Sequence, residues 1–330
     1  MTAKYNDILK TLSQFSKEEL VSIFNVVIES AKPSKQKISK CDCPYCSSKT
    51  VILYGKKRGK QRFLCKDCGR TFITTTHTIM SKSHYNSDIW YEMFLDTIDG
   101  HSLAYSEKRL GLSHPAAFHM RHKILIAMQD SLSKDPTILG DVCELDETYV
   151  LDCYKGKQLP ETCPRGPRKH GAKARKRGIS NEYVCLCTGV QRKGEAFVEA
   201  TNRAKPSKEE LISVFDGHVK DGAMFLTDGL RGYNALEKMA DCIVKNVEKE
   251  TASFYHLNTV NNLHSFIKDQ YKYYRGVATK YLNRYGVLFS VSYRKTEDII
   301  EKLKSQIFNV GHDSYTHTIS DIRGFRLLNL

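Results

Sequence analysis

Three acidic side chains stand within four positions of an apolar, β-branched stretch in the middle of the chain. The stretch is VCELDETYV, and it contains Glu144, Asp146 and Glu147. Its pattern predicts a strand, in which Glu144 and Asp146 share one face and Glu147 points to the other. A carboxylate inside a buried strand is costly unless it binds something. We therefore expect a functional role for these acids, with Asp146 as the first candidate for a metal ligand.

Two later motifs carry polar side chains that could complete a metal site with Asp146. The stretch AMFLTDG predicts an apolar strand that ends at Asp228. The stretch HLNTVNNLHSFIKDQYK predicts the start of a helix with Asn261, His264 and Lys268. Asn261 and Lys268 are seven residues apart, nearly two helical turns, so they share a face. This register favours Asn261 as the third ligand, and His264 is the alternative.

The elements that must position these side chains form an α/β pattern. Residues 139–250 alternate strand-like and helix-like runs, which predicts one α/β domain. Two further strands, EYVCLCTGV and GEAFVEATNR, precede the predicted helix SKEELISVF. Residues 154–178 interrupt this pattern with nine Lys or Arg against one Glu. We expect this basic insertion to be an exposed loop between strands.

Two pairs of cysteines have the spacing of a zinc site. CPYC and CKDC place Cys43, Cys46, Cys65 and Cys68 in the pattern C-x2-C-x18-C-x2-C. Each C-x2-C pair puts two thiolates on one side of a tetrahedral ion. A strand, a basic glycine turn and a second strand are predicted between the pairs. The sequence therefore predicts a zinc ribbon that needs its metal to fold, because it has almost no core.

The turn of this ribbon is strongly basic, which suits contact with DNA phosphates. Its cations are Lys56, Lys57, Arg58, Lys60 and Arg62. A zinc ribbon can also serve purely as a docking module for another protein, but the charge favours DNA.

Residues 84–130 have the rhythm of a helix-turn-helix. The first helix is predicted over 103–110, the turn is GLS, and the second helix begins at Ser113 and reaches Met128. The second helix offers several groove or phosphate contacts, namely His114, His119, Arg121, His122 and Lys123. An ordinary helical hairpin has much the same sequence pattern, so the preceding basic ribbon is what favours DNA binding by Arg121 and Lys123.

The composition favours a nucleic-acid partner and excludes a membrane protein. The 330-residue chain has 51 Lys and Arg against 37 Asp and Glu, a formal net charge of +14 and a pI near 9.2. A solvated basic surface would account for the excess, but nucleic acid is the commonest partner with many negative charges. No run approaches the roughly 18 apolar residues of a membrane helix, and the N-terminus lacks a signal-peptide pattern. We expect a cytoplasmic protein with reduced cysteines.

Taken in order, these motifs resemble a known family. A mid-strand Asp146, an Asp228 at the end of a later strand and a polar ligand on a following helix resemble the ribonuclease-H-like fold of the DDE transposases and integrases. With the zinc ribbon and the helical segment ahead of DETYV, LTDGLRGY and HLNTVNNLHSFIK, residues 40–295 are similar to one group of bacterial insertion-sequence transposases. In that group the third ligand is Glu, Asn or His, and a Lys follows seven residues later, as Lys268 follows Asn261.

The resemblance implies a two-metal site for DNA cleavage. Asp146, Asp228 and Asn261 would hold Mg²⁺ or Mn²⁺ ions that activate a water or a DNA 3′-hydroxyl. Lys268 would contact a DNA phosphate, and Glu147 would pack near the site or pair with a basic residue. Because Asn261 stands where many relatives have an acid, the site has one negative charge fewer.

We therefore expect an α/β, ribonuclease-H-like catalytic domain, a mixed sheet with flanking helices, behind two DNA-binding parts. The expected parts are an N-terminal helical segment (1–34), the zinc ribbon (35–76), the helix-turn-helix-like segment (84–130), the catalytic domain (139–305) with its basic insertion (154–178), and a tail (306–330). The expected function is that of a bacterial, nucleoid-associated DNA transposase. Its partners would be double-stranded DNA, as terminal inverted repeats and target, and further copies of the chain in an oligomer on DNA. The alternatives are a non-catalytic zinc-ribbon and helix-turn-helix regulator, and a ribonuclease-H-like nuclease for other nucleic acids.

Overall fold

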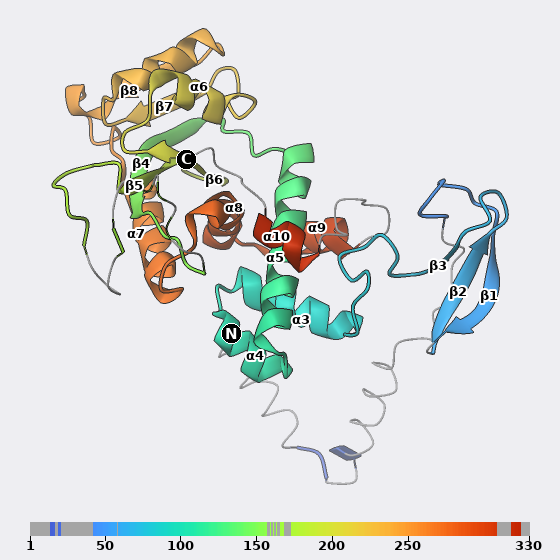
Figure 1. Ribbon diagram of the computed structural model, residues 1–330. Helices are drawn as coiled ribbons and strands as arrows, with labels where there is room; N and C mark the ends of the chain where they lie inside the picture. The colour runs from blue at the N-terminus through green and yellow to red at the C-terminus, as the bar shows by residue number, and fades with distance from the viewer. Residues whose placement is uncertain are drawn as a thin grey trace. The chain divides into compact units, whose positions relative to one another are not determined.

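The computed structural model describes residues 42–57, 59–156, 173–308 and 318–324, together with short stretches within 14–20 and 159–167. The chain divides into two compact units, Met1–Thr74 and Thr75–Leu330 (Figure 1). Near the N-terminus, Glu19 N–H donates to Ser16 Oγ at 3.3 Å and Ser16 N–H donates to Glu19 Oε2 at 2.8 Å. This reciprocal pair is a helix capping box. Most of the predicted N-terminal helical segment lies outside the described residues.

The described part of the first unit is a small antiparallel sheet. Its strands are β1 (Val51–Lys57), β2 (Lys60–Cys65) and β3 (Thr71–Ile73), in the order β1-β2-β3. Phe63 and Phe72 stack with their ring centroids 5.5 Å apart. The buried side chains of this core are Cys43, Val51, Phe63, Cys65 and Phe72. A core of this size stabilises a fold only weakly, so the unit depends on a further link.

The second unit is built around a five-stranded mixed sheet in the order β6-β5-β4-β7-β8. Its strands are β4 (Val142–Leu151), β5 (Tyr183–Gln191), β6 (Ala196–Arg203), β7 (Met224–Thr227) and β8 (Ile243–Asn246). The first three pair antiparallel as a meander, whereas β7 pairs parallel with β4 and β8 parallel with β7. Three antiparallel strands followed by two parallel ones form the ribonuclease-H-like arrangement, so the predicted fold class is confirmed.

Helices cover both faces of this sheet. The α-helices of the unit are α3 (Ser87–Ile98), α4 (Leu103–Leu110), α5 (His114–Lys134), α6 (Lys208–Phe215), α7 (Asn258–Tyr273), α8 (Leu282–Tyr293), α9 (Glu297–Phe308) and α10 (Ile319–Gly324); the 3-10 helices are η1 (Arg231–Lys238), η2 (Val247–Lys249) and η3 (Thr279–Tyr281). Helices α7 and α8 pack on one face, and α6 with η1 pack on the other (Figure 1).

Helices α4 and α5 form the predicted helix-turn-helix. Helix α4 ends at Gly111, whose φ of 64° is the left-handed conformation that glycine adopts without strain. Helix α5 starts after Ser113, as predicted, but continues to Lys134, beyond the expected end at Met128. It is longer because its central residues are enclosed by α3, α8 and α9 in the same core that covers the sheet.

The hydrophobic core of the second unit is divided by the sheet into two layers. Val150, Val184 and Leu186 face α7 and α8, whereas Leu145 and Cys187 face α6 and η1. The strand residues on both faces are apolar, as expected for strands that are buried on both sides. In the part of the chain that the structure describes, none of the helices combines the length and apolar character needed to cross a membrane.

Candidate functional site

Asp146 and Asp228 lie on neighbouring parallel strands, Asp146 within β4 and Asp228 just past the end of β7. Strand β4 pairs with β7 only over Val142–Glu144, so Asp146 lies just beyond this pairing, and Asp228 directly follows the last residue of β7. Within the described residues, no strand pairs with β4 on this side beyond Glu144. Because β7 lies next to β4, Asp228 is near enough for its negative charge to raise the pKa of Asp146.

Three of the predicted residues, Asp146, Asp228 and Lys268, lie close enough to affect one another electrostatically. Burial, together with the negative charge of Asp228, raises the pKa of Asp146 to about 6, although the backbone N–H of Glu147 and the cation of Lys268 on α7 lower it. The side chain of Asp146 is 19% exposed, and Asp228 is exposed. Two carboxylates that repel each other, with one cation nearby, form a site that favours a divalent metal ion.

A tight turn fixes Asp228. Its Oδ1 accepts the backbone N–H of Leu230 at 3.1 Å. Gly229, between them, has a φ of 93°, and a Cβ at this position would lie 2.3 Å from Nδ2 of Asn246. Only glycine fits both the backbone conformation and the space. The turn therefore aims the carboxylate of Asp228 and brings the end of β7 close to the end of β8.

His264 faces Asp146 with an unprotonated nitrogen. The hydroxyl of Thr188 donates its single proton to the backbone carbonyl of Asp146 at 2.6 Å, so it must accept a hydrogen bond from His264 Nε2, 2.8 Å away. Burial, assisted by the charge of Lys268, lowers the pKa of His264 to about 4, so the ring is neutral at pH 7. Nδ1 then carries a lone pair and lies 3.7 Å from Asp146 Oδ2. A cation or a hydrogen-bond donor between these two acceptors would stabilise both.

Helix α7 brings all three of its predicted residues to this side of the sheet. His264 is buried against Asp146, and Lys268, one turn further, acts electrostatically on both Asp146 and His264. Asn261 lies one turn earlier and is exposed. The donor set of Asp146, Asp228 and the oxygen or nitrogen of Asn261 or His264 fits Mg²⁺ or Mn²⁺.

Glu147 lies on the opposite face of β4, as the alternation predicted. Burial, together with the charges of Asp146 and Asp228, raises its pKa to about 7. The hydroxyl of Tyr233 on η1 and the cation of Lys205 act in the opposite direction. Glu147 therefore lies beside the two aspartates without sharing their face.

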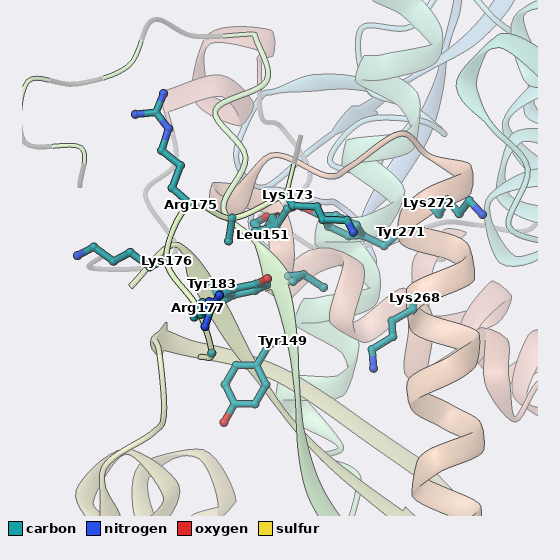
Figure 2. Close-up of a pocket in the computed structure, with 13 residues that line it drawn as sticks. Tyr149, Leu151, Lys173, Arg175, Lys176, Arg177, Tyr183, Lys268, Tyr271 and Lys272 are labelled. Atoms are coloured by element: carbon teal, nitrogen blue, oxygen red, sulfur yellow. Dashed lines mark hydrogen bonds between the residues drawn. The ribbon is translucent and has the colours of Figure 1, made fainter. Parts of the chain in front are cut away.

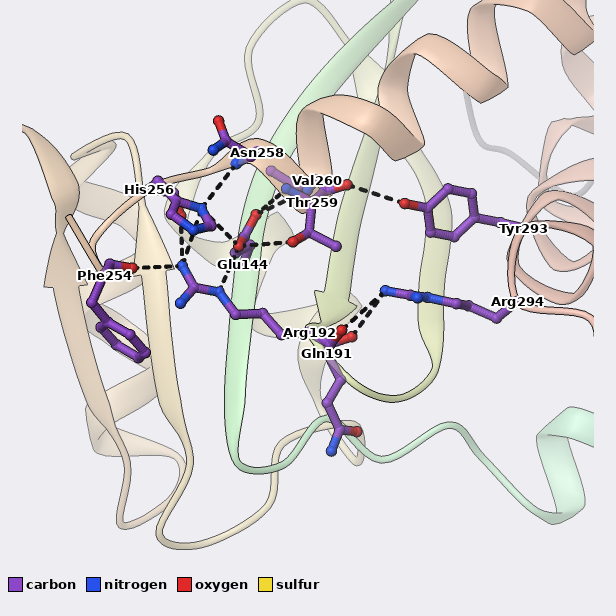
Figure 3. Close-up of polar contacts among 10 residues, drawn as sticks. All are labelled: Glu144, Gln191, Arg192, Phe254, His256, Asn258, Thr259, Val260, Tyr293 and Arg294. Carbon is purple, nitrogen blue, oxygen red and sulfur yellow. Dashed lines mark hydrogen bonds and ion pairs between the residues drawn. The ribbon is translucent and has the colours of Figure 1, made fainter.

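Glu144 uses both carboxylate oxygens inside the protein (Figure 3). The residue is fully buried. Its Oε2 accepts the backbone N–H groups of Thr259 at 2.7 Å and Val260 at 3.0 Å, and its Oε1 accepts Nε of Arg192 at 2.7 Å and Oγ1 of Thr259 at 3.0 Å. Leu257 before α7 provides no side-chain cap. Glu144 therefore caps this helix from the central strand, where its negative charge also favours the helix N-terminus.

Arg192 extends this network to the segment that leads into α7. Its Nη2 donates to the carbonyls of Phe254 at 2.8 Å and His256 at 3.1 Å, and its guanidinium lies 4.5 Å from the ring centroid of Phe254. From α8, the hydroxyl of Tyr293 donates to the carbonyl of Thr259 at 3.3 Å (Figure 3). The start of α7 is thus held by β4, β5 and α8. The sequence predicted a functional role for the acids of this stretch as a group, but not that Glu144 would cap α7.

The four predicted cysteines come together in the first unit. The sulfur atoms of Cys43, Cys46, Cys65 and Cys68 all lie within 4.8 Å of one another. The Cys43–Cys68 and Cys46–Cys65 sulfur pairs are 3.7 and 3.6 Å apart. Two zinc–sulfur bonds of about 2.3 Å at the tetrahedral angle separate the sulfurs by roughly 3.8 Å, so the cluster could hold a zinc ion.

The cations predicted for the ribbon turn fall into two groups. Lys56, Lys57 and Lys60 are exposed, while Arg58 lies outside the described residues. Arg62 is half-buried, donates from Nη2 to Thr71 Oγ1 at 2.9 Å and lies 5.3 Å from the ring centroid of Tyr54. The three exposed lysines remain available to a phosphate.

Arg121 and Lys123 on α5 are buried, whereas the sequence predicted that they face DNA. Their exposed fractions are 1% and 3%. Lys123 Nζ donates to the carbonyls of Ile79 at 3.1 Å and Ser81 at 3.5 Å, and burial lowers its pKa to about 8. Arg121 Nη2 donates to Ser106 Oγ at 3.4 Å. Because these side chains point into the unit, this conformation gives them no direct contact with DNA.

Comparisons with known proteins find similarity to transposases. Residues 138–295 match the family model of the ISXO2-like transposase domain. An uncharacterized protein in the transposable element ISH50 of Halobacterium salinarum (strain ATCC 700922 / JCM 11081 / NRC-1) is 26% identical over 253 residues, which cover 74% of this chain and 82% of the relative. A chain of a pre-cleavage Mos1 transpososome has a TM-score of 0.26 at 14% identity, over 67% of this chain and 79% of that one. A chain of the Mos1 strand transfer complex has a TM-score of 0.27 at 14% identity, over 67% and 77%.

The match of residues 138–295 to the ISXO2-like transposase domain and the ribonuclease-H-like strand order support a DNA transposase of the DDE superfamily. The relative in a transposable element supports an insertion-sequence transposase in particular.

Proposed function

We propose that this transposase cleaves and joins DNA at a divalent-metal site formed by Asp146, Asp228 and a third ligand from α7. The observation that carries the proposal is the juxtaposition of Asp146, within β4, and Asp228, just past the end of β7. On the facing helix, His264 Nδ1 lies 3.7 Å from Asp146 Oδ2, and Lys268 acts electrostatically on the same carboxylate. Bound Mg²⁺ or Mn²⁺ would activate the attacking oxygen and stabilise the leaving oxygen.

The residues of the chain have separate tasks in this proposal. Asp146 and Asp228 bind the cations, and the side-chain oxygen of Asn261 completes the donor set. Lys268 binds a phosphate of the DNA strand beside the scissile bond. The bare Nδ1 of His264 accepts a hydrogen bond from the attacking water or 3′-hydroxyl, or itself replaces Asn261 as the ligand. Glu144 holds α7, and with it Asn261, at the correct distance from β4.

The rest of the proposed activity concerns DNA and its recognition. The four cysteines of the first unit hold a structural zinc ion, and the exposed lysines of the ribbon turn bind phosphates of the terminal inverted repeats. The target is also double-stranded DNA, and a homo-oligomer pairs the two ends of the element. A purely regulatory DNA-binding protein would not need the two carboxylates of Asp146 and Asp228. The match to a transposase family also disfavours this alternative.

The test is cleavage of DNA that carries the inverted repeats flanking the gene, with and without Mg²⁺. Asp146→Asn and Asp228→Asn should each lower the cleavage rate by several orders of magnitude while DNA binding is retained. Asp216→Asn, an exposed acid at the end of α6, is the matched control and should cleave normally. Normal cleavage by Asp146→Asn, or cleavage by the native protein in EDTA, would refute the proposed site.

A further inference from the structure

A basic cleft lies at the end of β4 and shares Lys268 with the proposed metal site. Its walls are the end of β4 at Tyr149–Leu151, the residues 173–178, Tyr183 at the start of β5, and α7 at Lys268, Tyr271 and Lys272. Its volume is about 470 Å³. In Figure 2, Lys268 reaches from α7 toward the strand that also carries Asp146, and the segment with Arg175 and Lys176 lies across the strand from it.

The charge of this cleft has a single sign. Its described lining contains six cationic side chains and no acid: Lys173, Arg175, Lys176, Arg177, Lys268 and Lys272. The five cations other than Lys268 are exposed and have no task in the proposed metal site. A cleft of this charge attracts a chain of phosphates and repels the basic surface of another copy of the protein.

Tyrosine side chains give the cleft surfaces for stacking. Tyr149, Tyr183 and Tyr271 all line it. In the antiparallel pairing of β4 and β5, Tyr149 lies opposite Cys185 and Leu151 opposite Tyr183, which makes Tyr149 and Tyr183 diagonal neighbours on one face. This is the face of Glu147, opposite that of Asp146, so a DNA strand that reaches both tyrosines from the metal site passes over the free edge of β4. Diagonal neighbours are about 7–8 Å apart, within reach of one base or two adjacent ones. Aromatic rings combined with cations are the features that bind single-stranded nucleic acid irrespective of sequence.

The walls of the cleft are held in place by buried contacts. Glu182, 2% exposed, accepts the backbone N–H groups of Arg175 at 3.0 Å and Lys176 at 3.3 Å through its Oε1. On the other side, the hydroxyl of Tyr271 donates to the carbonyl of Leu151 at 2.8 Å, which ties α7 to the end of β4. The cations therefore project from an anchored backbone on both sides.

We propose that this cleft binds an unpaired stretch of DNA, one or two nucleotides of the strand whose phosphate lies at Asp146. Ligands of nucleotide size fill pockets of about 300–1,000 Å³, and the volume of this cleft lies in that range. Bases stack on Tyr149 and Tyr183, and phosphates contact the cations of residues 173–178 and Lys272. This inference rests on the proposed function for its location, because a strand that is cut and later joined must be held beside the metal site in between.

The experiment is photo-crosslinking of the full chain to a short oligothymidylate that carries one 5-iododeoxyuridine, in EDTA. Crosslinks should map by mass spectrometry to peptides that contain Tyr149 or Tyr183. Tyr183→Leu should weaken oligothymidylate binding by about 5- to 150-fold, as expected when one base no longer stacks, while Tyr183→Phe should bind normally. Arg175→Ala combined with Arg177→Ala should lower the slope of log affinity against log salt by about 0.7 for each phosphate that is no longer bound.

The control is Lys193→Ala, which removes an exposed cation from the β5–β6 turn at the opposite end of β5. It should change neither the crosslinks nor the affinity, and all variants should melt at the same temperature as the native protein. Crosslinks that map only to the ribbon, equal losses of affinity in the Lys193→Ala control, or competition by duplex DNA as effective as by single strands would each overturn the proposal.

These experiments test the proposed cleft and the proposed metal site independently. Crosslinking needs no metal, so Asp146→Asn should crosslink like the native protein. If cleavage proves independent of Asp146 while the crosslinks persist, the metal assignment falls and the cleft stands. If cleavage follows the aspartates and no crosslink reaches Tyr149 or Tyr183, the cleft falls and the metal site stands.

Discussion

The backbone N–H of Thr259, in the first turn of α7, donates to Glu144 on the central strand at 2.7 Å. Glu144 is two residues before Asp146, and α7 carries His264 and Lys268. The same short piece of β4 therefore supplies one proposed metal ligand and anchors the helix that supplies another. Because a misplacement of about 1 Å in such a site can lower the rate by about 100-fold, this anchor should matter for catalysis as well as for stability.

Glu144→Ala should destabilise the protein strongly. The substitution leaves two buried N–H groups of α7 without their acceptor and Arg192 without its carboxylate, and breaking a buried ion pair in this way costs about 3–5 kcal/mol. Glu144→Gln keeps one acceptor oxygen and should cost about 1–3 kcal/mol. Urea unfolding measures both, with Glu209→Gln on the exposed side of α6 as a control that should stay within about 0.5 kcal/mol.

Positioning and stability can be separated in the Glu144→Gln protein. Where both proteins are fully folded, the substitution should lower the maximal cleavage rate and raise the Mg²⁺ concentration needed for half of it. A cleavage rate per folded molecule equal to that of the native protein would mean that Glu144 stabilises the fold and does nothing more. Arg192→Ala should couple to Glu144→Ala in a double-mutant cycle by about 0.5–3 kcal/mol.

Substitutions in α7 should decide between Asn261 and His264. If Asn261 is the third ligand, Asn261→Ala should lose nearly all cleavage, whereas Asn261→Asp should keep some because an oxygen ligand remains. His264→Gln should retain the hydrogen bond to Thr188 but lose the Nδ1 acceptor, and should lower the rate by about 10- to 100-fold. His264→Asn keeps an atom near the Nδ1 position and should be milder. An active Asn261→Ala beside an inactive His264→Gln would assign the ligand to His264.

Each chain should contain one zinc ion in its first unit. Backbone N–H groups of Cys68 and Asp67 lower the pKa of Cys65 to about 6 although burial opposes them, whereas burial and the neighbouring sulfurs raise the pKa values of Cys46 and Cys68. A zinc ion would bind all four as thiolates. Cys65→Ser should abolish zinc binding and unfold the ribbon, because a site this small folds only with its metal. Elemental analysis of the full chain is the measurement, and Cys242→Ser in the second unit should still carry zinc. Native protein purified without chelators and free of zinc would contradict the assignment.

Local patterns in the sequence were sufficient to predict the elements of the site. An acid within a run of β-branched residues is costly, so Asp146 stood out, and the apolar strand before Asp228 was equally clear. The shared helix face of Asn261 and Lys268 was predicted from their spacing of seven residues, nearly two helical turns. The fold class came from the order of these elements, and it was confirmed. Strand β8 was missed because its four residues, Ile243–Asn246, are too few and too mixed in character to show a period.

The contacts of Glu144 could not be predicted from the sequence. Its partners Thr259 and Arg192 are 115 and 48 residues away, and only the folded sheet brings them together. The burial of Arg121 and Lys123 could not be predicted from the sequence either. Cations on a helix near a turn usually face solvent, but α3, α8 and α9 enclose the middle of α5 and bury both side chains. Tertiary packing, which local pattern does not encode, decided both cases.

Lys123 should make the stability of the protein rise with pH between about 8 and 10.5. Burial lowers its pKa to about 8 in the folded protein, against 10.5 for an ordinary lysine. Below pH 8 both states hold the proton, and above pH 10.5 neither does. Between these values the unfolded chain binds more protons than the folded one, so the free energy of unfolding rises with pH, by up to about 1.4 kcal/mol per unit. Lys123→Met, of similar length and without a charge, should remove this rise. Urea unfolding of both proteins at pH 8, 9 and 10 isolates the effect, since other titrating groups are common to both, and parallel pH profiles would show that Lys123 titrates normally.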